Sequence, residues 1–511
     1  MSTQSEIVVE TSSGKLAGEQ RGAHAVFRGI PFAQPPVGAL RFRGPELVHP
    51  WKGVRAAKEF GPSSLQGLVF APGVSAEGPT SEDCLYLNVY TPRADGQKRA
   101  VMFFVHGGAF TVGSAATPLY DGAKLAELHD VVVVTINYRV GALGYLALGA
   151  DAARWGAVDN CGQHDQIAAL RWVRDNIGGF GGDPDNVTIF GESAGGTAVC
   201  LLLATPCARG LFRRAIAQSS VGALKLRTPE EVAPISEAYL AALGLTSAQS
   251  ESLLQLPAEA LMRAQATVEA NPKGWPHFSP ALDRELFAGQ HPQDLVASGQ
   301  GSQVPLLIGT NRDEWNLFAL ATLPDWNKPM DDDEVVSRLA RKLPRDKVGA
   351  APGLVEAYRA SRRERGLAHG NRALLRALEG DLRFRIPSVR FAELYRQRVP
   401  ETYLYLFTYE SPALRGELGA CHALELPFVF GTYDGPNQER FAGQSDTVVA
   451  LSATMRESWT NFAKTGSPCS ARADKWPTYD LSRRATLEFG AEVQLVDDAY
   501  GNERAAWDGV L

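Results

Sequence analysis

The sequence predicts an α/β fold in which a large, mostly parallel sheet carries helices on both faces. Residues 101–105 and 131–137 are continuous apolar runs of strand length, which is typical of strands covered on both faces. Residues 120–128 have a helical pattern, and residues 163–177 repeat apolar side chains at the spacing of an amphipathic helix. The resulting β-α-β-α order indicates the doubly wound class.

The N-terminal region is predicted to form short strands and loops. Residues 7–11 and 14–18 indicate a hairpin. Residues 27–38 are rich in proline and glycine and are predicted to be irregular. Residues 61–83 are predicted to be a long surface loop, and loops of that length are often functional.

The rest of the chain is predicted to complete one sheet and to cover it with helices. Strands are expected at residues 187–190, 214–219, 304–310 and 402–409. Helical insertions are expected at about 224–300 and 330–398, where they would wall the top of the sheet. Since we find no repeat and no low-complexity linker, residues 1–511 are expected to form a single domain.

Acidic residues mark the start of two predicted helices. Asp331, with the acidic residues that follow it, suits the beginning of a helix because of the helix dipole. Asp446 is placed to cap a late helix over residues 447–464.

Composition indicates an ordinary globular protein. The formal net charge of -6 argues against nucleic acid as a partner, and the basic residues of 359–376 are interspersed with acidic ones as on a solvated helix face. The first ten residues lack the features of a secretory signal, and no apolar run reaches the length of a membrane span. The six cysteines have no metal-binding spacing and are expected to be free thiols. We therefore expect a cytoplasmic protein without metal or cofactor, and a monomer.

The chain is organised around the stretch Gly191-Glu192-Ser193-Ala194-Gly195. It follows an apolar β-branched run and opens a buried helical run, and strand, G-x-S-x-G, helix is the context of a nucleophile elbow. Glycine is needed two residues either side of Ser193 because a side chain there would strike the neighbouring strand or helix. The alternative is a glycine-rich turn without chemistry.

A serine hydroxyl needs a base and an orienting acid before it attacks at neutral pH. Downstream of Ser193, Asp313 and Glu314 follow the strand at 304–310, and the residues alone do not choose between them. His422 lies in a glycine-rich loop after the strand at 402–409. The order serine, acid, histidine is that of α/β-hydrolases, although a structural histidine is the alternative.

An oxyanion hole is predicted at His106-Gly107-Gly108-Ala109, directly after the strand at 101–105. Glycines allow backbone N–H groups to face a carbonyl oxygen without an intervening Cβ. Ala194, the residue after the nucleophile, supplies another N–H at the start of a helix.

Over nearly its whole length the chain resembles the type-B carboxylesterases, the cholinesterase-like branch of the α/β-hydrolase fold, and it looks most like the bacterial p-nitrobenzyl esterases. The matching stretches lie at residues 27–33, 82–90, 106–110, 137–139, 180–184, 191–196, 309–314 and 459–468. This resemblance implies a large, mostly parallel sheet with helical insertions over the active site.

The resemblance also implies roles for single residues. Ser193 would be the nucleophile, Glu314 rather than Asp313 the acid, and His422 the base. The N–H groups of Gly108, Ala109 and Ala194 would form the oxyanion hole, with Gly107 holding the turn. Supporting roles would fall to Ser219, which hydrogen-bonds the acid, to Glu425 near the histidine, and to Glu192 beside the nucleophile.

Two departures from the family bear on function. Secreted members close a disulfide to the position of Cys84, but here the partner position reads Ser63-Ser64, so the bridge cannot form. The tryptophan that binds quaternary ammonium groups in cholinesterases is missing, because no tryptophan lies between Trp51 and Trp155. Choline esters are therefore not expected as substrates.

We expect a serine esterase that hydrolyses small-to-medium, aryl or bulky alcohol esters through an acyl-enzyme. The Gly-Gly-Ala oxyanion loop is associated in the family with bulky alcohols, so tertiary-alcohol esters are an expected minor activity. The alternatives are hydrolysis of carbamates or amides, a long-chain lipase, and a cholinesterase-like interaction protein that has lost catalysis.

Overall fold

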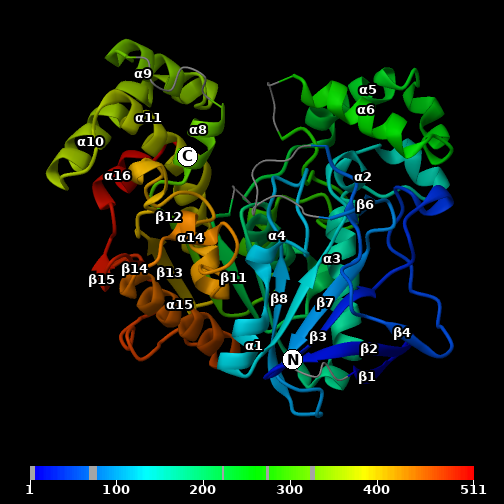
Figure 1. Ribbon diagram of the computed structural model, residues 1–511. Coiled ribbons are helices and arrows are strands. Elements are labelled where there is room, and N and C mark those ends of the chain that lie inside the picture. The colour runs from blue at the N-terminus through cyan, green and yellow to red at the C-terminus, as the bar shows by residue number, and fades with distance from the viewer. Residues whose placement is uncertain (1–5, 68–77, 221–223, 272–275, 323–328) are drawn as a thin grey trace.

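The computed structural model describes residues 6–67, 78–220, 224–271, 276–322 and 329–511. Within these residues the chain is built on one 13-stranded sheet (Figure 1), in the order β1-β2-β3-β7-β9-β8-β10-β11-β12-β13-β14-β15, with β4 beside β2. Its strands are β1 (Glu6–Thr11), β2 (Gly14–Arg21), β3 (His24–Pro31), β4 (Val54–Ala56), β7 (Tyr86–Thr91), β8 (Arg99–Val105), β9 (Val132–Ile136), β10 (Gly182–Glu192), β11 (Arg214–Gln218), β12 (Leu306–Asn311), β13 (Thr402–Phe407), β14 (Ala485–Phe489) and β15 (Val493–Asp497).

The middle of the sheet is parallel and its two ends are mainly antiparallel, although the short β4 pairs with β2 in parallel. Strands β9, β8, β10, β11, β12, β13 and β14 pair in parallel, whereas β1, β2, β3, β7 and β15 add antiparallel pairs. Every residue of β9, β12 and β13 is buried. The predicted fold class is confirmed, because continuous apolar runs form the parallel strands that helices cover on both faces.

The side chains of strand β8 alternate between two hydrophobic cores, one on each face of the sheet. Val101, Phe103 and Val105 belong to one hydrophobic core, and Met102 and Phe104 belong to the other. The first core includes side chains of α3 (Cys161–Asn176) and α4 (Ala194–Ala204). The second includes side chains of α1 (Ala123–His129) and α15 (Asp446–Thr465). Alternation along the strand therefore fixes which helices cover which face.

Two sets of helices are inserted between strands of the parallel region. Between β11 and β12 lie α5 (Pro229–Ala242), α6 (Ala258–Glu269) and α7 (Pro292–Ser298). Between β12 and β13 lie α8 (Trp315–Thr322), α9 (Asp332–Ala340), α10 (Ala351–Glu364), α11 (Asn371–Gly380), a π-helical turn (Asp381–Arg385) and α12 (Ile386–Tyr395). In Figure 1, α5 and α6 stand apart from the group α8 to α11, toward the same end of the molecule.

The second insertion has a small core of its own. Leu339 of α9, Tyr358 of α10 and Leu378 of α11 pack together with Trp507, which follows the C-terminal helix α16 (Gly501–Ala506). Trp507 Nε1 donates a hydrogen bond to the Tyr358 hydroxyl at 2.7 Å. The end of the chain is thus part of the insertion that follows Glu314. The remaining short helices are α2 (Gly141–Tyr145), α13 (Leu426–Phe430) and α14 (Gln438–Ala442).

Most predicted elements are confirmed, and two local predictions are wrong. The β1–β2 hairpin forms, and Asp331 caps α9 by accepting a hydrogen bond from Glu334 N at 2.8 Å. Residues 27–31, predicted to be irregular, belong to β3, which tolerates them through a register shift between Phe27 and Ile30. Asp446 does not cap α15; the preceding Ser445 does, by accepting from Val448 N.

The predicted loop at 61–83 contains two short paired strands, β5 (Ser63–Ser64) and β6 (Thr80–Ser81). Residues 68–77 of this loop lie outside the described residues. None of the described helices combines the length and apolar character needed to cross a bilayer.

Candidate active site

Ser193 occupies a sharp turn between the end of β10 and the start of α4. Its backbone has φ 60° and ψ −122°, a conformation that non-glycine residues rarely adopt and that is found where the surrounding structure enforces it. The turn is held by the Ser193 N–H, which donates to Gln218 O at 2.9 Å, and by Thr197 N, which donates to Ser193 O at 2.9 Å. Ser193 is partly exposed between two buried elements.

The glycines of the elbow are required by close packing. A Cβ on Gly195 would overlap the carbonyl oxygen of Val105, and a Cβ on Gly191 would lie 2.6 Å from the carbonyl carbon of Gly195. A Cβ on Gly196 would overlap Gln218 O. Helix α4 therefore approaches β8 and β11 as closely as it does only because these positions lack side chains.

His422 and Glu314 meet, although 108 residues separate them in the sequence. The Nδ1 atom of His422 lies 2.6 Å from Glu314 Oε2. The other carboxylate oxygen of Glu314 accepts from Ser219 Oγ at 2.6 Å and from Asn311 N at 2.8 Å. Glu314 is thus fixed by three partners, and its contact with Nδ1 leaves Nε2 of His422 available on the far side of the ring.

Nε2 of His422 faces the nucleophile elbow. It lies 3.0 Å from Oε1 of Glu192, the residue directly before Ser193. The position of a Cβ on Gly107 would be 2.9 Å from Glu192 Oε2 and 3.1 Å from Ser193 Cβ. The loop after β8, the elbow after β10 and the loop that carries His422 therefore converge.

Burial and charge set the pKa values at this point. Burial alone would lower the pKa of His422, but the carboxylates of Glu192 and Glu314 outweigh it and raise this pKa to about 9. Burial raises the pKa of Glu192 to about 8, although the charge of His422 opposes the shift. The imidazole is therefore a stronger base than an exposed histidine.

The loop after β8 turns sharply over three residues. Gly108, Ala109 and Phe110 all have positive φ, of 110°, 54° and 61°. Thr111 N and Val112 N both donate to Gly108 O at 3.0 Å, and a Cβ on Gly108 would overlap Val112 O. Gly108 and Ala109 are partly exposed, and within the described residues no protein group accepts a hydrogen bond from the N–H of either one.

His106 anchors the base of this loop. Its Nδ1 lies 2.8 Å from Gly107 O, and its ring stacks on Tyr138 with the centroids 4.4 Å apart. The Tyr138 hydroxyl donates to His106 O at 2.8 Å. Burial lowers the pKa of His106 to about 4, so this ring is neutral at pH 7.

Glu425 forms hydrogen bonds with residues at the ends of β11 and β12, and none with the imidazole of His422 among the described residues. Its carboxylate accepts from Gln218 Nε2 at 3.0 Å and from Asn311 Nδ2 at 2.7 Å. Trp459 Nε1 donates to Gln218 Oε1 at 3.1 Å. These contacts tie the ends of β11 and β12 to α15. Burial and the charge of Glu314 raise the pKa of Glu425.

The structure brings together the candidate residues that the sequence indicated. It also separates the two adjacent acids, because Glu314 contacts His422 whereas Asp313 accepts hydrogen bonds from Arg312 and Ala420 N. Sequence reasoning missed Phe318 and Phe384, whose ring centroids lie 5.0 Å and 4.6 Å from that of His422. They belong to the second insertion, and no motif distinguishes them from core aromatics.

Comparison with known proteins identifies the family. The model of the carboxylesterase family matches residues 5–507. The chain belongs to the carboxylesterase family. It is 38% identical over 506 residues to the para-nitrobenzyl esterase of Bacillus subtilis (strain 168), covering 97% of each chain. It is 36% identical over 495 residues to the cocaine esterase of Homo sapiens, covering 92% of this chain and 85% of the relative.

Solved structures agree with this membership. Carboxylesterase EST55 of Geobacillus stearothermophilus, solved at pH 6.2, is 40% identical with a TM-score of 0.85, over 98% of this chain and 99% of that one. A PNB esterase structure is 36% identical with a TM-score of 0.85, over 98% and 99% of the two chains. The protein is therefore a carboxylic ester hydrolase with the α/β-hydrolase fold.

The six cysteines of this carboxylesterase are free, and four of them are buried. Cys84 lies beside the hydroxyl of Ser64, which also accepts a hydrogen bond from Val140 N at 3.3 Å. A serine thus stands next to the thiol that a bridge would use. Among the described residues, no cluster of three His, Cys, Asp or Glu side chains is arranged to hold a metal ion.

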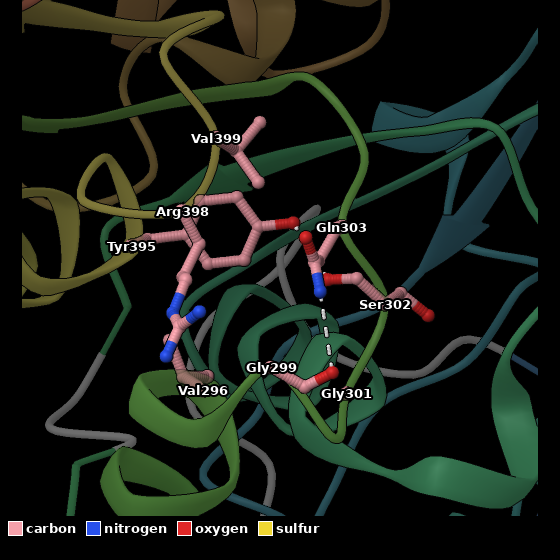
Figure 2. Close-up of a pocket in the computed structure, with 8 residues that line it drawn as sticks. All are labelled: Val296, Gly299, Gly301, Ser302, Gln303, Tyr395, Arg398 and Val399. Carbon is pink, nitrogen blue, oxygen red and sulfur yellow. Dashed lines mark hydrogen bonds between the residues drawn. The ribbon is translucent and has the colours of Figure 1, made fainter.

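A small pocket (Figure 2) lies near the start of β12, whereas Glu314 follows the end of this strand. The residues that line it are Val296, Gly299, Gly301, Ser302, Gln303, Tyr395, Arg398 and Val399, and its space suits a water-sized occupant. Gln303 Nε2 donates across it to Gly299 O at 3.2 Å. Because β12 runs between this pocket and Glu314, the pocket is separate from the carboxylesterase site.

Proposed function

We propose that Ser193, His422 and Glu314 of this carboxylesterase form its catalytic triad and that ester hydrolysis proceeds through an acyl-enzyme. The observation that carries the proposal is the position of His422, whose Nδ1 binds Glu314 at 2.6 Å while its Nε2 faces the elbow of Ser193. A serine is a useful nucleophile only where such an oriented base is within reach.

In the first half of the reaction, Ser193 Oγ attacks the ester carbonyl while its proton moves to His422 Nε2. The resulting tetrahedral intermediate carries its negative charge on the former carbonyl oxygen. It collapses to the acyl-enzyme when His422 gives the proton to the departing alcohol oxygen. In the second half, water replaces the serine hydroxyl as the attacking group. His422 takes its proton and returns it to Ser193 Oγ as the carboxylic acid leaves.

The proposed oxyanion hole consists of the N–H groups of Gly108, Ala109 and Ala194, with Gly107 keeping the loop against the elbow. Two features support it: the N–H groups of Gly108 and Ala109 have no acceptor among the described residues, and Ala194 is the first residue of α4, whose N–H has no partner within the helix. Each donor of this kind typically stabilises the transition state by about 3 to 4 kcal/mol.

Supporting roles are proposed for three further residues. Ser219 fixes the rotamer of Glu314 through its 2.6 Å hydrogen bond. Glu192 raises the basicity of His422 through its negative charge. Glu425 holds Gln218 and Asn311, and thereby the strand ends on which the acid is placed.

For the substrate, we propose carboxylic esters of small-to-medium, aryl or bulky alcohols. The Gly108–Ala109 turn is partly exposed, and the rings of Phe318 and Phe384 offer an apolar surface beside the imidazole. The Bacillus subtilis relative is named a para-nitrobenzyl esterase.

We further propose that residues 1–511 act as one catalytic domain, supported by the sheet that joins β1 to β15. We also propose a cytoplasmic location, which the free cysteines support, and a monomeric state.

Covalent labelling tests the mechanism. Incubation with diethyl p-nitrophenyl phosphate should release one p-nitrophenolate per chain and leave a phosphoryl group on the peptide that contains Ser193, seen by mass spectrometry. A matched panel of p-nitrophenyl esters, anilides and long-chain esters then separates an esterase from an amidase or a lipase. Labelling at another serine, or turnover without labelling, would overturn the proposal.

A further inference from the structure

We propose that Asp313, the acidic neighbour of Glu314, is a positioning residue that holds the loop carrying His422 against the segment carrying Glu314. This inference rests on the proposed catalytic function. Asp313 acts together with Asn311 and Asn316, and these three residues are called the loop clamp below. They contact the backbone of residues 417–421, which lead directly to His422.

The loop clamp forms hydrogen bonds with the backbone of four of the five residues 417–421. Asn311 Nδ2 donates to Cys421 O at 2.7 Å. Asp313 N donates to Ala420 O at 2.9 Å, and Ala420 N returns a hydrogen bond to Asp313 Oδ2 at 3.0 Å. Asn316 Nδ2 donates to Leu418 O at 3.0 Å and to Glu417 O at 3.3 Å. The backbone before His422 is thus fixed by residues on both sides of Glu314.

The loop approaches Asp313 more closely than a side chain would allow. Gly419 has φ 55°, and a Cβ at this position would lie 2.6 Å from Asp313 Oδ2. Residues 414–417 are exposed, whereas residues 418–422 are buried. The chain therefore passes from solvent to the active site within a few residues, and the loop clamp acts at this transition.

Charge holds Asp313 in place. Its Oδ2 accepts from Arg312 Nε at 2.9 Å and from Arg312 Nη2 at 2.7 Å, and Arg362 Nη2 lies 3.9 Å from Oδ1. The side chain of Asp313 is only 9% exposed. Although burial opposes ionisation, the two arginines lower the pKa of Asp313 below its ordinary value. The acceptor for Ala420 N is therefore a fixed carboxylate.

Adjacent acids thus divide two tasks. Glu314 binds the imidazole and Asp313 binds the backbone two residues before it. Residues 311–316 carry Glu314 and also hold residues 417–421, which lead to His422. The distance between Glu314 and His422 is therefore set by direct contacts between these two segments. A displacement of about 1 Å in a catalytic group can lower the rate about 100-fold.

The first test compares Asp313→Ala, Asp313→Asn and the control Glu410→Gln. Glu410 is the exposed partner of the same Arg312, at 2.5 Å, and is 58% exposed. Asp313→Ala should lower kcat about 100-fold with little change in KM. Asp313→Asn keeps one oxygen acceptor and should lose less, and Glu410→Gln should leave kcat unchanged. The apparent pKa of the kcat/KM profile should fall in Asp313→Ala, because a loosened His422 pairs less well with Glu314.

Asn316→Ala supplies a second, independent test, because it removes donors to the loop without touching the buried ion pair. We expect a lower kcat and faster hydrogen exchange of residues 416–422. If Asp313→Ala does not fold, the kcat values of Asp313→Asn and Asn316→Ala test the positioning role instead. Folded variants of Asp313 and Asn316 with wild-type kcat and a wild-type pH profile would overturn the positioning role of Asp313. They would leave the proposed mechanism unaffected. Full turnover in Ser193→Ala or His422→Ala would instead overturn the proposed mechanism.

Discussion

The Nε2 atom of His422 lies 3.0 Å from Oε1 of Glu192. This nitrogen is the one that exchanges a proton with Ser193 in the proposed mechanism, so a buried carboxylate stands beside the proton-transfer step. Within the described residues, Glu192 Oε1 has no well-aligned hydrogen-bond donor. Its influence on His422 is therefore mainly that of its charge, which helps to raise the pKa of His422 to about 9.

Replacing Glu192 by glutamine should shift the pH dependence of the esterase. The reaction needs the neutral imidazole, so kcat/KM should rise as the pH passes through the pKa of His422, about 9 in the wild type. Glu192→Gln removes the largest charge that raises this pKa. The rising limb should therefore move to lower pH, as measured with an activated aryl ester. Asp346→Asn, at a carboxylate that is 77% exposed, is the control. An unmoved or upward-shifted limb would contradict the assignment.

Ser193→Ala should remove nearly all turnover without unfolding the protein. Loss of the nucleophile in a serine hydrolase costs about 10⁶-fold in kcat, and the residual rate comes from the oxyanion hole and binding. Steady-state hydrolysis of a p-nitrophenyl ester measures the loss, and circular dichroism controls for folding. Organophosphate labelling should disappear in the same variant. Persistent labelling would point to another nucleophile.

Replacing Glu314 should lower kcat far more than replacing Ser219, which only orients it. Glu314→Gln leaves an amide opposite Nδ1 of His422 and should lower kcat about 10⁴-fold, as loss of the acid does in such triads. Ser219→Ala removes one of the three hydrogen bonds to Glu314 and should cost about tenfold. Both variants should retain the wild-type KM within a few-fold. Equal losses would mean that Ser219 does more than orient the acid.

Gly195→Ala should destabilise the elbow. The added Cβ would meet the carbonyl oxygen of Val105, and this is backbone that cannot move aside. We expect the free energy of unfolding to fall by about 2 to 3 kcal/mol, at the upper end for added methyl groups, as measured by urea denaturation. Gly178→Ala is the matched control, because no atom lies within 4 Å of its Cβ position. Similar stabilities for the two variants would show that the elbow can relax.

Much of this architecture could be read from the sequence because its signals are local. Apolar runs located β8, β9, β12 and β13, and the elbow pattern located Ser193 with its flanking strand and helix. Local signals failed where two rules compete. The proline and glycine near residues 27–31 indicated irregular chain, but pairing with β7 makes β3 continue there through a bulge. Ser445 rather than Asp446 caps α15 because the cap must lie one residue before the first helical turn.

The sequence by itself determined the order of serine, acid and histidine along the chain. It also determined the glycines of the elbow and of the oxyanion loop, and one histidine with two adjacent acids as its candidate partners. The residues alone left open which acid faces the imidazole, and the family resemblance indicated Glu314. The tertiary structure supplies the physical reason, because it places Glu314 against His422 and Asp313 against Arg312 and Ala420 N. It also brought Glu192, Phe318 and Phe384 to His422. The physical reason is that a side chain's role depends on the partners within hydrogen-bond reach. Those partners come from strands and insertions that only folding brings together.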